Sequence, residues 1–202
     1  MLVPVSGSQG CGKTTIINEL YKAGHPIIQR KTSRSILSEW GVSLNEVNQD
    51  PQLTMKFQEE IIRRKFLDEK EAIESDQIVF TERTYADLFT YALVALGRDN
   101  DFDDWLRDYY LRCMTYQQSY SMVFYLTAGH FTVQKDGVRA SNKQYSTLVD
   151  LSMQEFTRQM TSHNRLNIVS TPVLQERKTI IEVQTLSALN PAAFNLNLLQ
   201  SL

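Results

Sequence analysis

Eight consecutive residues near the start of the sequence have the types and spacing of a phosphate-binding site. The run Gly7-Ser8-Gln9-Gly10-Cys11-Gly12-Lys13-Thr14 matches the pattern G-x-x-x-x-G-K-[ST] at every fixed position. Glycines let the backbone approach a phosphate closely, so that N–H groups and a helix N-terminus converge on the anion. We expect Lys13 to pair with β- and γ-phosphate oxygens, and Thr14 to ligate Mg²⁺. The run predicts a phosphate-binding loop (P-loop) for ATP, formed by Gly7, Gly10, Cys11, Gly12, Lys13, Thr14 and Thr15.

Other charged residues directly follow segments that are typical of strands. Glu82-Arg83-Thr84 comes after the apolar residues 77–80, and a basic segment, residues 29–34, comes after residues 26–28. A further charged run, Asp136-Gly137-Val138-Arg139, follows residues 122–126. Charges at the carboxyl end of a strand beside the P-loop are well placed to act on a phosphoryl group. These runs are therefore candidate parts of one site.

Short strands alternating with helices must position these residues. The expected strands are residues 2–6, 26–28, 77–80, 122–126 and 166–170. The expected helices are one after the P-loop, with Ile16, Ile17, Leu20 and Tyr21 on one face, and residues 55–74, 87–96, 101–116, 143–160 and 174–186. This alternation predicts βαβ crossovers. The expected fold class is α/β, a three-layer P-loop NTPase fold with a roughly five-stranded parallel sheet flanked by helices.

The longest expected helix, residues 55–74, has an apolar and a charged side. Phe57, Ile61, Phe66 and Ile73 can share a face. Glu59 with Arg63, and Glu60 with Arg64, are spaced four apart, as in intrahelical ion pairs. We expect the charged face to be solvated.

Length and composition predict one globular domain. The chain has 202 residues, 42% of them hydrophobic, and its formal net charge is −2. We expect a P-loop domain over residues 1–186, with a lid segment near 130–142, and a weakly structured tail over 187–202. The low net charge favours small-molecule acceptors over nucleic acid. The two cysteines have no metal-ligand spacing, and no apolar run approaches the roughly 20 residues of a membrane helix. A cytoplasmic protein without a membrane partner is expected, and a homodimer is left open.

The motifs resemble those of the nucleoside and nucleotide kinase branch of P-loop proteins, from Met1 to about Thr171. Glu82-Arg83-Thr84 is similar to the Glu-Arg-Ser triplet of deoxynucleoside kinases. That resemblance implies that Glu82 lies near Mg²⁺ and that Arg83 lies near the acceptor hydroxyl and the transferring phosphoryl group. Phe57-Gln58 resembles a Phe-Gln pair that stacks on and hydrogen-bonds the acceptor base in those kinases.

The segment Asp136–Arg139 resembles the lid that closes over ATP in the same kinases. The resemblance implies that Arg139, helped by Lys135, touches the phosphates during transfer. An arginine on a lid can neutralise charge that develops on the transferred group.

The chain departs from deoxynucleoside kinases after the second strand. Those enzymes usually have a carboxylate there as the base, whereas this chain has Arg30, Lys31, Thr32, Ser33 and Arg34. Cations suit an acceptor that is already anionic, such as a nucleoside monophosphate. Arg30 and Arg34 are therefore predicted to bind the acceptor, together with Phe57, Gln58 and Asp87.

The same cations could instead hold the backbone of DNA whose modified base carries the hydroxyl, as in the phage kinases that act on 5-hydroxymethyluracil. In that case Glu82, Asp87 or Glu39 must serve as the base.

Three other classes of P-loop protein were compared with these motifs. A regulatory GTPase would need Asp-x-x-Gly and Asn-Lys-x-Asp, and Asn142-Lys143-Gln144-Tyr145 lacks the aspartate. A mechanical ATPase remains open, because it shares the P-loop. A non-catalytic phosphate-binding protein is disfavoured, because Lys13, Thr14, Glu82 and Arg139 are all present. The preferred hypothesis is a Mg²⁺-dependent kinase that transfers the γ-phosphoryl group of ATP to a nucleoside monophosphate or deoxynucleoside.

Overall fold

A parallel β-sheet forms the centre of the molecule. A computed structural model describes residues 1–28, 32–128 and 143–189. The strands are β1 (Leu2–Ser6), β2 (Ile27–Ile28), β3 (Val79–Glu82), β4 (Val123–Leu126) and β5 (Leu166–Val169). Each pair of neighbouring strands in this described sheet is parallel, in the order β2-β3-β1-β4-β5. The predicted five-stranded parallel sheet is confirmed.

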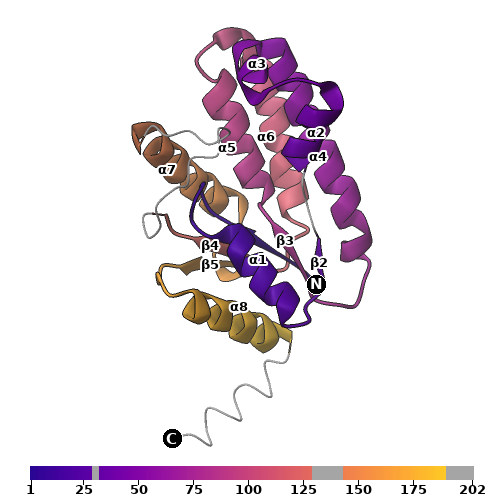
Figure 1. Cartoon of the computed structure of the whole chain (residues 1–202), viewed down its shortest axis with the longest axis vertical. Helices are drawn as coiled ribbons and strands as arrows, with labels where there is room; N and C mark the ends of the chain where they lie inside the picture. The colour runs from indigo at the N-terminus through magenta and orange to yellow at the C-terminus, as the bar shows by residue number, and fades with distance from the viewer. Residues whose placement is uncertain (29–31, 129–142, 190–202) are drawn as a thin grey trace, which may run out of the picture.

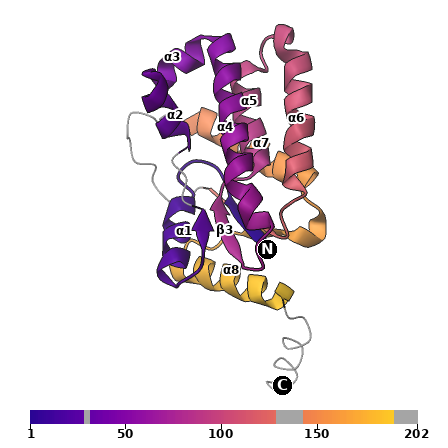
Figure 2. The same ribbon diagram turned by 90° about the vertical axis from the view of Figure 1, so that its right-hand side faces the viewer.

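Helices cover both faces of this sheet (Figure 1). One face carries α1 (Lys13–Lys22) and α8 (Leu174–Leu189), while α4 (Pro51–Ile73), α5 (Tyr85–Leu96), α6 (Asp103–Gln117) and α7 (Lys143–Met160) lie on the other side. The remaining elements are α2 (Thr32–Trp40), α3 (Leu44–Gln49) and two short 3₁₀ turns, Asn100–Phe102 and His163–Arg165. In Figure 2, α1 lies beside β3, α8 runs below them, and α2 to α6 rise above.

Two hydrophobic cores follow from the alternation of side chains along the strands. Leu2 belongs to the core shared with α4, α5 and α6, whereas Val3 belongs to the core shared with α1 and α8. Both are 1% exposed or less. A parallel strand with both faces buried must be apolar throughout, which explains the run Leu2–Ser6.

Strand register brings the predicted motifs together. Val5 of β1 is aligned with Glu82 of β3 on one side and with Phe124 of β4 on the other. The P-loop leaves β1 directly after Ser6, and Arg83 leaves β3 directly after Glu82. Both therefore emerge at the same edge of the sheet.

Several predicted boundaries were wrong. β3 spans Val79–Glu82 rather than residues 77–80, because its pairing with β1 continues to Glu82. From Thr32 onward the basic segment belongs to the helix α2, which was not among the expected helices. The helix expected at residues 55–74 begins at Pro51, where Asp50 caps the N–H groups of Gln52 and Leu53. Helix α8 continues to Leu189, so residues 187–189 are not part of a loose tail.

The predicted side-chain pattern also needed correction. Tyr21 is 57% exposed, so it does not share the buried face of α1. Glu59 contacts Arg112 and Trp105 of α6 rather than Arg63. Arg63 and Arg64 both contact Glu60. The charged side of α4 is thus partly an interhelix contact.

The described parts of the chain contain no helix that is long and apolar enough to cross a membrane. The predicted lid segment, residues 130–142, lies outside the described residues, as do residues 190–202 of the tail.

Candidate active site

The P-loop has the backbone shape of an anion-binding turn. Gly7, Gly10 and Gly12 have φ angles of 135°, 82° and 96°. A Cβ atom on Gly7 would lie 2.5 Å from the carbonyl oxygen of Leu126 and 2.7 Å from the Sγ of Cys11. Only glycine therefore fits between β4 and the loop. Gly12 is the N-cap of α1 and makes no side-chain cap, so the first turn of the helix has backbone N–H groups to offer an anion.

Lys13 folds back onto the loop that precedes it. Its Nζ donates to the carbonyl oxygens of Gly7 at 2.6 Å and Ser8 at 2.9 Å. The residue is 8% exposed. Burial lowers its pKa, but Cys11, Tyr91 and Asp87 outweigh that effect, so the pKa of Lys13 lies above its ordinary value. The ammonium is a fixed positive charge within the loop.

Two oxygen-bearing side chains meet beside the P-loop. The hydroxyl of Thr14 donates to Oε2 of Glu82 at 3.0 Å. A hydroxyl and a carboxylate are hard oxygen ligands that suit Mg²⁺. No cluster of three or more His, Cys, Asp or Glu that could hold a metal occurs among the described residues. A magnesium ion at this pair would therefore take its remaining ligands from nucleotide phosphates and water.

Arg83 has an unusual backbone conformation. Its φ of 68° is the only positive value found for a non-glycine residue in the described chain. This left-handed conformation costs about 1–2 kcal/mol. The N–H of Arg83 donates to the carbonyl of Val5 at 2.9 Å, and the guanidinium carbon lies 5.6 Å from the ring centroid of Tyr91. Burial lowers the pKa of Arg83, but Tyr91, Glu82 and Asp87 outweigh it and hold the pKa above its ordinary value.

Asp87 lies beneath the site rather than at its surface. It is 0% exposed. Its Oδ1 accepts hydrogen bonds from the hydroxyls of Ser6 and Thr84, while its Oδ2 has no hydrogen-bond partner within the described residues. Asp87 thus links the end of β1 to the N-terminus of α5. Direct contact with an acceptor would require the covering residues to move.

Phe57 and Gln58 are buried in α4. Phe57 is 3% exposed and meets Trp40 edge-on at a centroid distance of 6.1 Å. Gln58 is 6% exposed, and its backbone carbonyl oxygen accepts from the hydroxyl of Tyr109 at 3.2 Å. Both residues are part of the packing between α4 and its neighbouring helices in this structure, so their predicted base-reading role stays a prediction.

The remaining predicted residues lie in α2 or outside the described residues. Arg34 is an exposed residue of α2. Glu39, also in α2, is held by Arg64, whose hydrogen bonds lower the pKa of the Glu39 carboxyl. A carboxylate paired in this way is a weak base. Arg30, Lys31, Lys135 and Arg139 lie outside the described residues.

Thr15 and Cys11 complete the P-loop prediction. Thr15 is exposed in the first turn of α1, next to Thr14. Cys11 is 1% exposed, and burial raises the pKa of its thiol. The thiol is therefore protonated at neutral pH, which agrees with an inert packing role.

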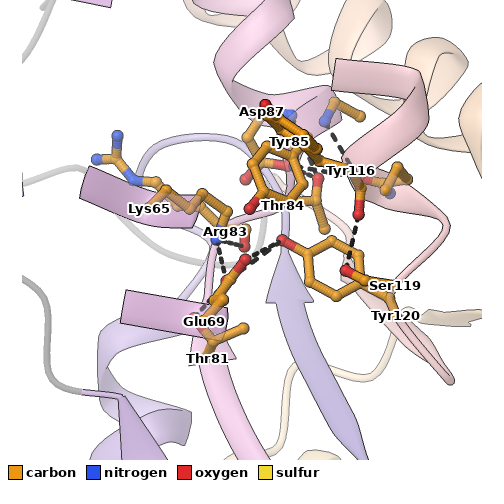
Figure 3. A network of polar contacts seen from close by, with 12 residues as sticks. Lys65, Glu69, Thr81, Arg83, Thr84, Tyr85, Asp87, Tyr116, Ser119 and Tyr120 are labelled. Carbon is orange, nitrogen blue, oxygen red and sulfur yellow. Dashed lines mark hydrogen bonds and ion pairs between the residues drawn. The ribbon is translucent and has the colours of Figure 1, made fainter. Parts of the chain in front are cut away.

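A buried network beneath Arg83 was not predicted (Figure 3). Lys65 of α4 pairs with Glu69 and also donates to the carbonyl of Arg83. Thr81 and Tyr120 donate to the same glutamate. The sequence contained a signal: Lys65 and Glu69 continue the four-residue spacing of Phe57 and Ile61, and therefore fall on the buried face.

The start of α5 is also held by side chains from elsewhere. Oε1 of Gln117 accepts from the N–H groups of Tyr85 at 3.0 Å and Ala86 at 3.3 Å. Thr84 is the N-cap and accepts from the N–H of Asp87. The segment that follows Glu82 is thus held by the side chain of Gln117, which binds its backbone, and by the Thr84 cap of α5.

A small recess lies against the P-loop, lined by Ser8, Gln9, Tyr91, Tyr145, Ser146 and Val149. A larger hollow lies on the outer side of α4 and is lined by residues such as Trp40, Met55 and Arg112. None of the predicted site residues lines that hollow. The small recess includes Ser8 and Gln9 of the P-loop, whereas no P-loop residue lines the hollow.

Comparisons with known proteins agree with this fold. The AAA domain family model matches residues 2–177. No curated protein matched the chain. The structure of deoxyadenosine kinase from M. mycoides with products dCMP and a flexible dCDP has a TM-score of 0.71 and 17% identity, covering 93% of this chain and 100% of that one. The same kinase with bound dATP has a TM-score of 0.68 and 17% identity, covering 92% and 99%.

The NadR protein in complex with NR is also similar in structure. Its TM-score is 0.64 with 16% identity, and the match covers 83% of this chain but 45% of that one. At these identities the likenesses show a shared fold.

Proposed function

The chain belongs to the AAA domain family, and on that premise we propose that it is an ATP-dependent kinase that phosphorylates a nucleoside monophosphate or a deoxynucleoside. The observation that carries the proposal is the meeting of Thr14 with Glu82, 3.0 Å apart at the edge of the sheet where the P-loop emerges. A plain phosphate-binding turn would not need a carboxylate there. Phosphoryl transfer does, because its metal ion needs protein oxygen ligands.

The chain's own residues would bind and orient the phosphates of ATP and neutralise their charge. The P-loop N–H groups hold the phosphates, and the ammonium of Lys13 leaves the carbonyls of Gly7 and Ser8 to pair with phosphate oxygens. Thr14 and Glu82 would hold Mg²⁺, which supplies charge neutralisation to the β- and γ-phosphates when bound. Arg83, already a cation next to Glu82, would pair with the transferring group.

Two observations support a nucleotide-type acceptor. The similar structures of deoxyadenosine kinase hold dCMP with dCDP, or dATP, and that of NadR holds NR. The basic segment after β2, with Arg30 and Arg34, favours an acceptor that already carries a phosphate. Kinase action on a hydroxymethylated base in DNA is the alternative acceptor that the experiment must include.

A label-transfer assay tests the proposal. Wild-type protein and Lys13→Ala are incubated with Mg²⁺ and γ-labelled ATP, together with nucleosides, nucleoside monophosphates, plain DNA or DNA containing hydroxymethylated bases. We expect label on a free nucleotide or nucleoside, and a loss of about 10²–10³-fold or more in Lys13→Ala. Thermal unfolding of both proteins checks that the variant is folded. Label on modified DNA alone would replace the acceptor assignment, and full activity in Lys13→Ala would refute the site.

A further inference from the structure

A buried ion pair holds the backbone of Arg83, and we propose that Lys65 is a positioning residue for phosphoryl transfer. The reaction in this inference rests on the proposed function, whereas the contacts of Lys65 with Arg83 come from the structure alone. Lys65 and Glu69 lie one turn apart in α4, and each is 1% exposed. Nζ of Lys65 lies 2.5 Å from Oε1 of Glu69. The pair is therefore enclosed by protein.

The Lys65 ammonium reaches past its ion pair to Arg83. It donates to the carbonyl oxygen of Arg83 at 2.9 Å. On its other side, the N–H of Arg83 donates to the carbonyl of Val5 at 2.9 Å. The peptide groups on both sides of the Arg83 Cα are thus held, one by α4 and the other by β1. This grip fixes the φ of 68°, and with it the direction in which the guanidinium leaves the backbone.

Surrounding groups hold the ammonium in place, as Figure 3 shows. The Glu69 carboxylate accepts from the hydroxyl of Thr81 at 3.1 Å and from that of Tyr120 at 3.1 Å. Nζ of Lys65 also lies 5.2 Å from the ring centroid of Tyr85 and 5.7 Å from that of Tyr120. The rings attract the cation through their negative faces. Both charges of the pair are therefore compensated.

Stability alone is a poor reason for this pair. Removing two charges from water costs about as much as their attraction returns, and an apolar pair of similar size is often as stable. The preceding positions on the same face of α4 are the apolar residues Phe57 and Ile61. What an apolar pair would not supply is a donor to the Arg83 carbonyl.

Four proteins separate positioning from stability: wild type, Lys65→Met, Glu69→Gln and the double variant. Lys65→Met removes the donor and the positive charge that Lys65 holds against the buried Glu69 carboxylate, so both kcat and Tm should fall. The double variant removes both charges, and the amide that replaces the Glu69 carboxylate can still accept from Thr81 or Tyr120. Its Tm should recover, while its kcat should stay about 10²-fold below wild type with the KM for ATP little changed. Glu69→Gln keeps the Lys65 ammonium as the donor to Arg83, so its Tm should fall more than its kcat.

Arg112→Met is the matched control. It removes a different ion pair of α4, the one with Glu59, which does not touch Arg83. Its Tm should fall while its kcat stays at the wild-type value. If the double variant recovers kcat together with Tm, Lys65 has only a structural role and the proposal is wrong.

Hydrogen exchange tests the grip without any turnover. The Arg83 amide should exchange faster in Lys65→Met and in the double variant than in wild type, and should change little in Arg112→Met. An unchanged exchange rate of the Arg83 amide in the double variant would show that Lys65 does not hold the backbone of Arg83. If exchange follows Lys65 but wild type transfers no phosphoryl group to any acceptor, then the proposed function fails while the backbone role of Lys65 stands.

Discussion

At the scale of single residues, Arg83 shows how one side chain depends on its backbone. The motif Glu82-Arg83-Thr84 was recognisable in the sequence, but the left-handed conformation of Arg83 was not. A sequence pattern gives residue types and not φ angles. A non-glycine residue at positive φ persists only where neighbouring groups hold it, which is more common at functional sites than elsewhere.

Two substitutions of Arg83 separate its backbone from its side chain. Arg83→Ala and Arg83→Gly both remove the guanidinium, so both should lose most of the transfer rate. Glycine accepts a φ of 68° without a Cβ clash, so Arg83→Gly should be more stable than Arg83→Ala by about 1 kcal/mol. Urea unfolding of the two variants measures the difference. Equal stability, or a more stable alanine variant, would contradict a strained backbone at this position.

Four of the predicted site residues share a simple property. Glu82 and Arg83 lie at the end of β3, Lys13 and Thr14 end the loop that follows β1, and the parallel sheet brings the ends of these two strands together. The spacing of α4 could have marked Lys65 as buried, but not its contact with the carbonyl of Arg83, because that contact depends on how α4 packs against the segment after β3. The base-reading role inferred for Phe57 stays a prediction, because its ring is packed in the core.

At the scale of elements, α2 shows where local signals were too weak. Residues 29–34 are polar and basic, and no helix was predicted there. The helix Thr32–Trp40 instead packs on α4 through Ile36, which is 0% exposed. A single apolar turn in a short segment does not show a clear helical period. Packing against α4 is what favours the helix here.

An ion-pair chain joins α2 to α4 and predicts a pH effect. Arg64 contacts both Glu39 and Glu60. Hydrogen bonds from Arg63 and Arg64 lower the pKa of Glu60 to about 2. Because the folded-state pKa lies below the unfolded one, this stabilisation is fully present above about pH 4.3. It is lost as the pH falls towards 2.

Glu60→Gln tests this effect. The variant should be less stable than wild type by about 1 kcal/mol at pH 7, a value reduced for solvent screening. The difference should shrink at pH 3, where wild type has lost part of the contribution. Urea unfolding at both pH values measures it, with Glu71→Gln, an exposed residue of the same helix, as the control. A difference that does not change between pH 7 and pH 3 would show that the ion pairs with Glu60 contribute no pH dependence.

At the scale of the whole molecule, the order β2-β3-β1-β4-β5 explains the position of the site. β1 is central, and the P-loop that follows it lies between the ends of β3 and β4. In open parallel sheets, ligands bind at the carboxyl ends of the strands. The α/β class and the parallel sheet could be predicted because strand and helix patterns alternate clearly. The packing of α4, α5 and α6 above the sheet could not, because it depends on contacts between distant segments.

The central claim is that this site transfers phosphoryl groups to an acceptor rather than to water. The most direct test mixes wild-type protein, Mg²⁺ and ATP with the acceptor found in the label-transfer assay, and measures ADP and phosphorylated acceptor in the same reaction. We expect equal amounts of the two products, and almost no ADP when the acceptor is omitted. ADP that forms at the same rate without any acceptor would show a hydrolytic ATPase and contradict the kinase.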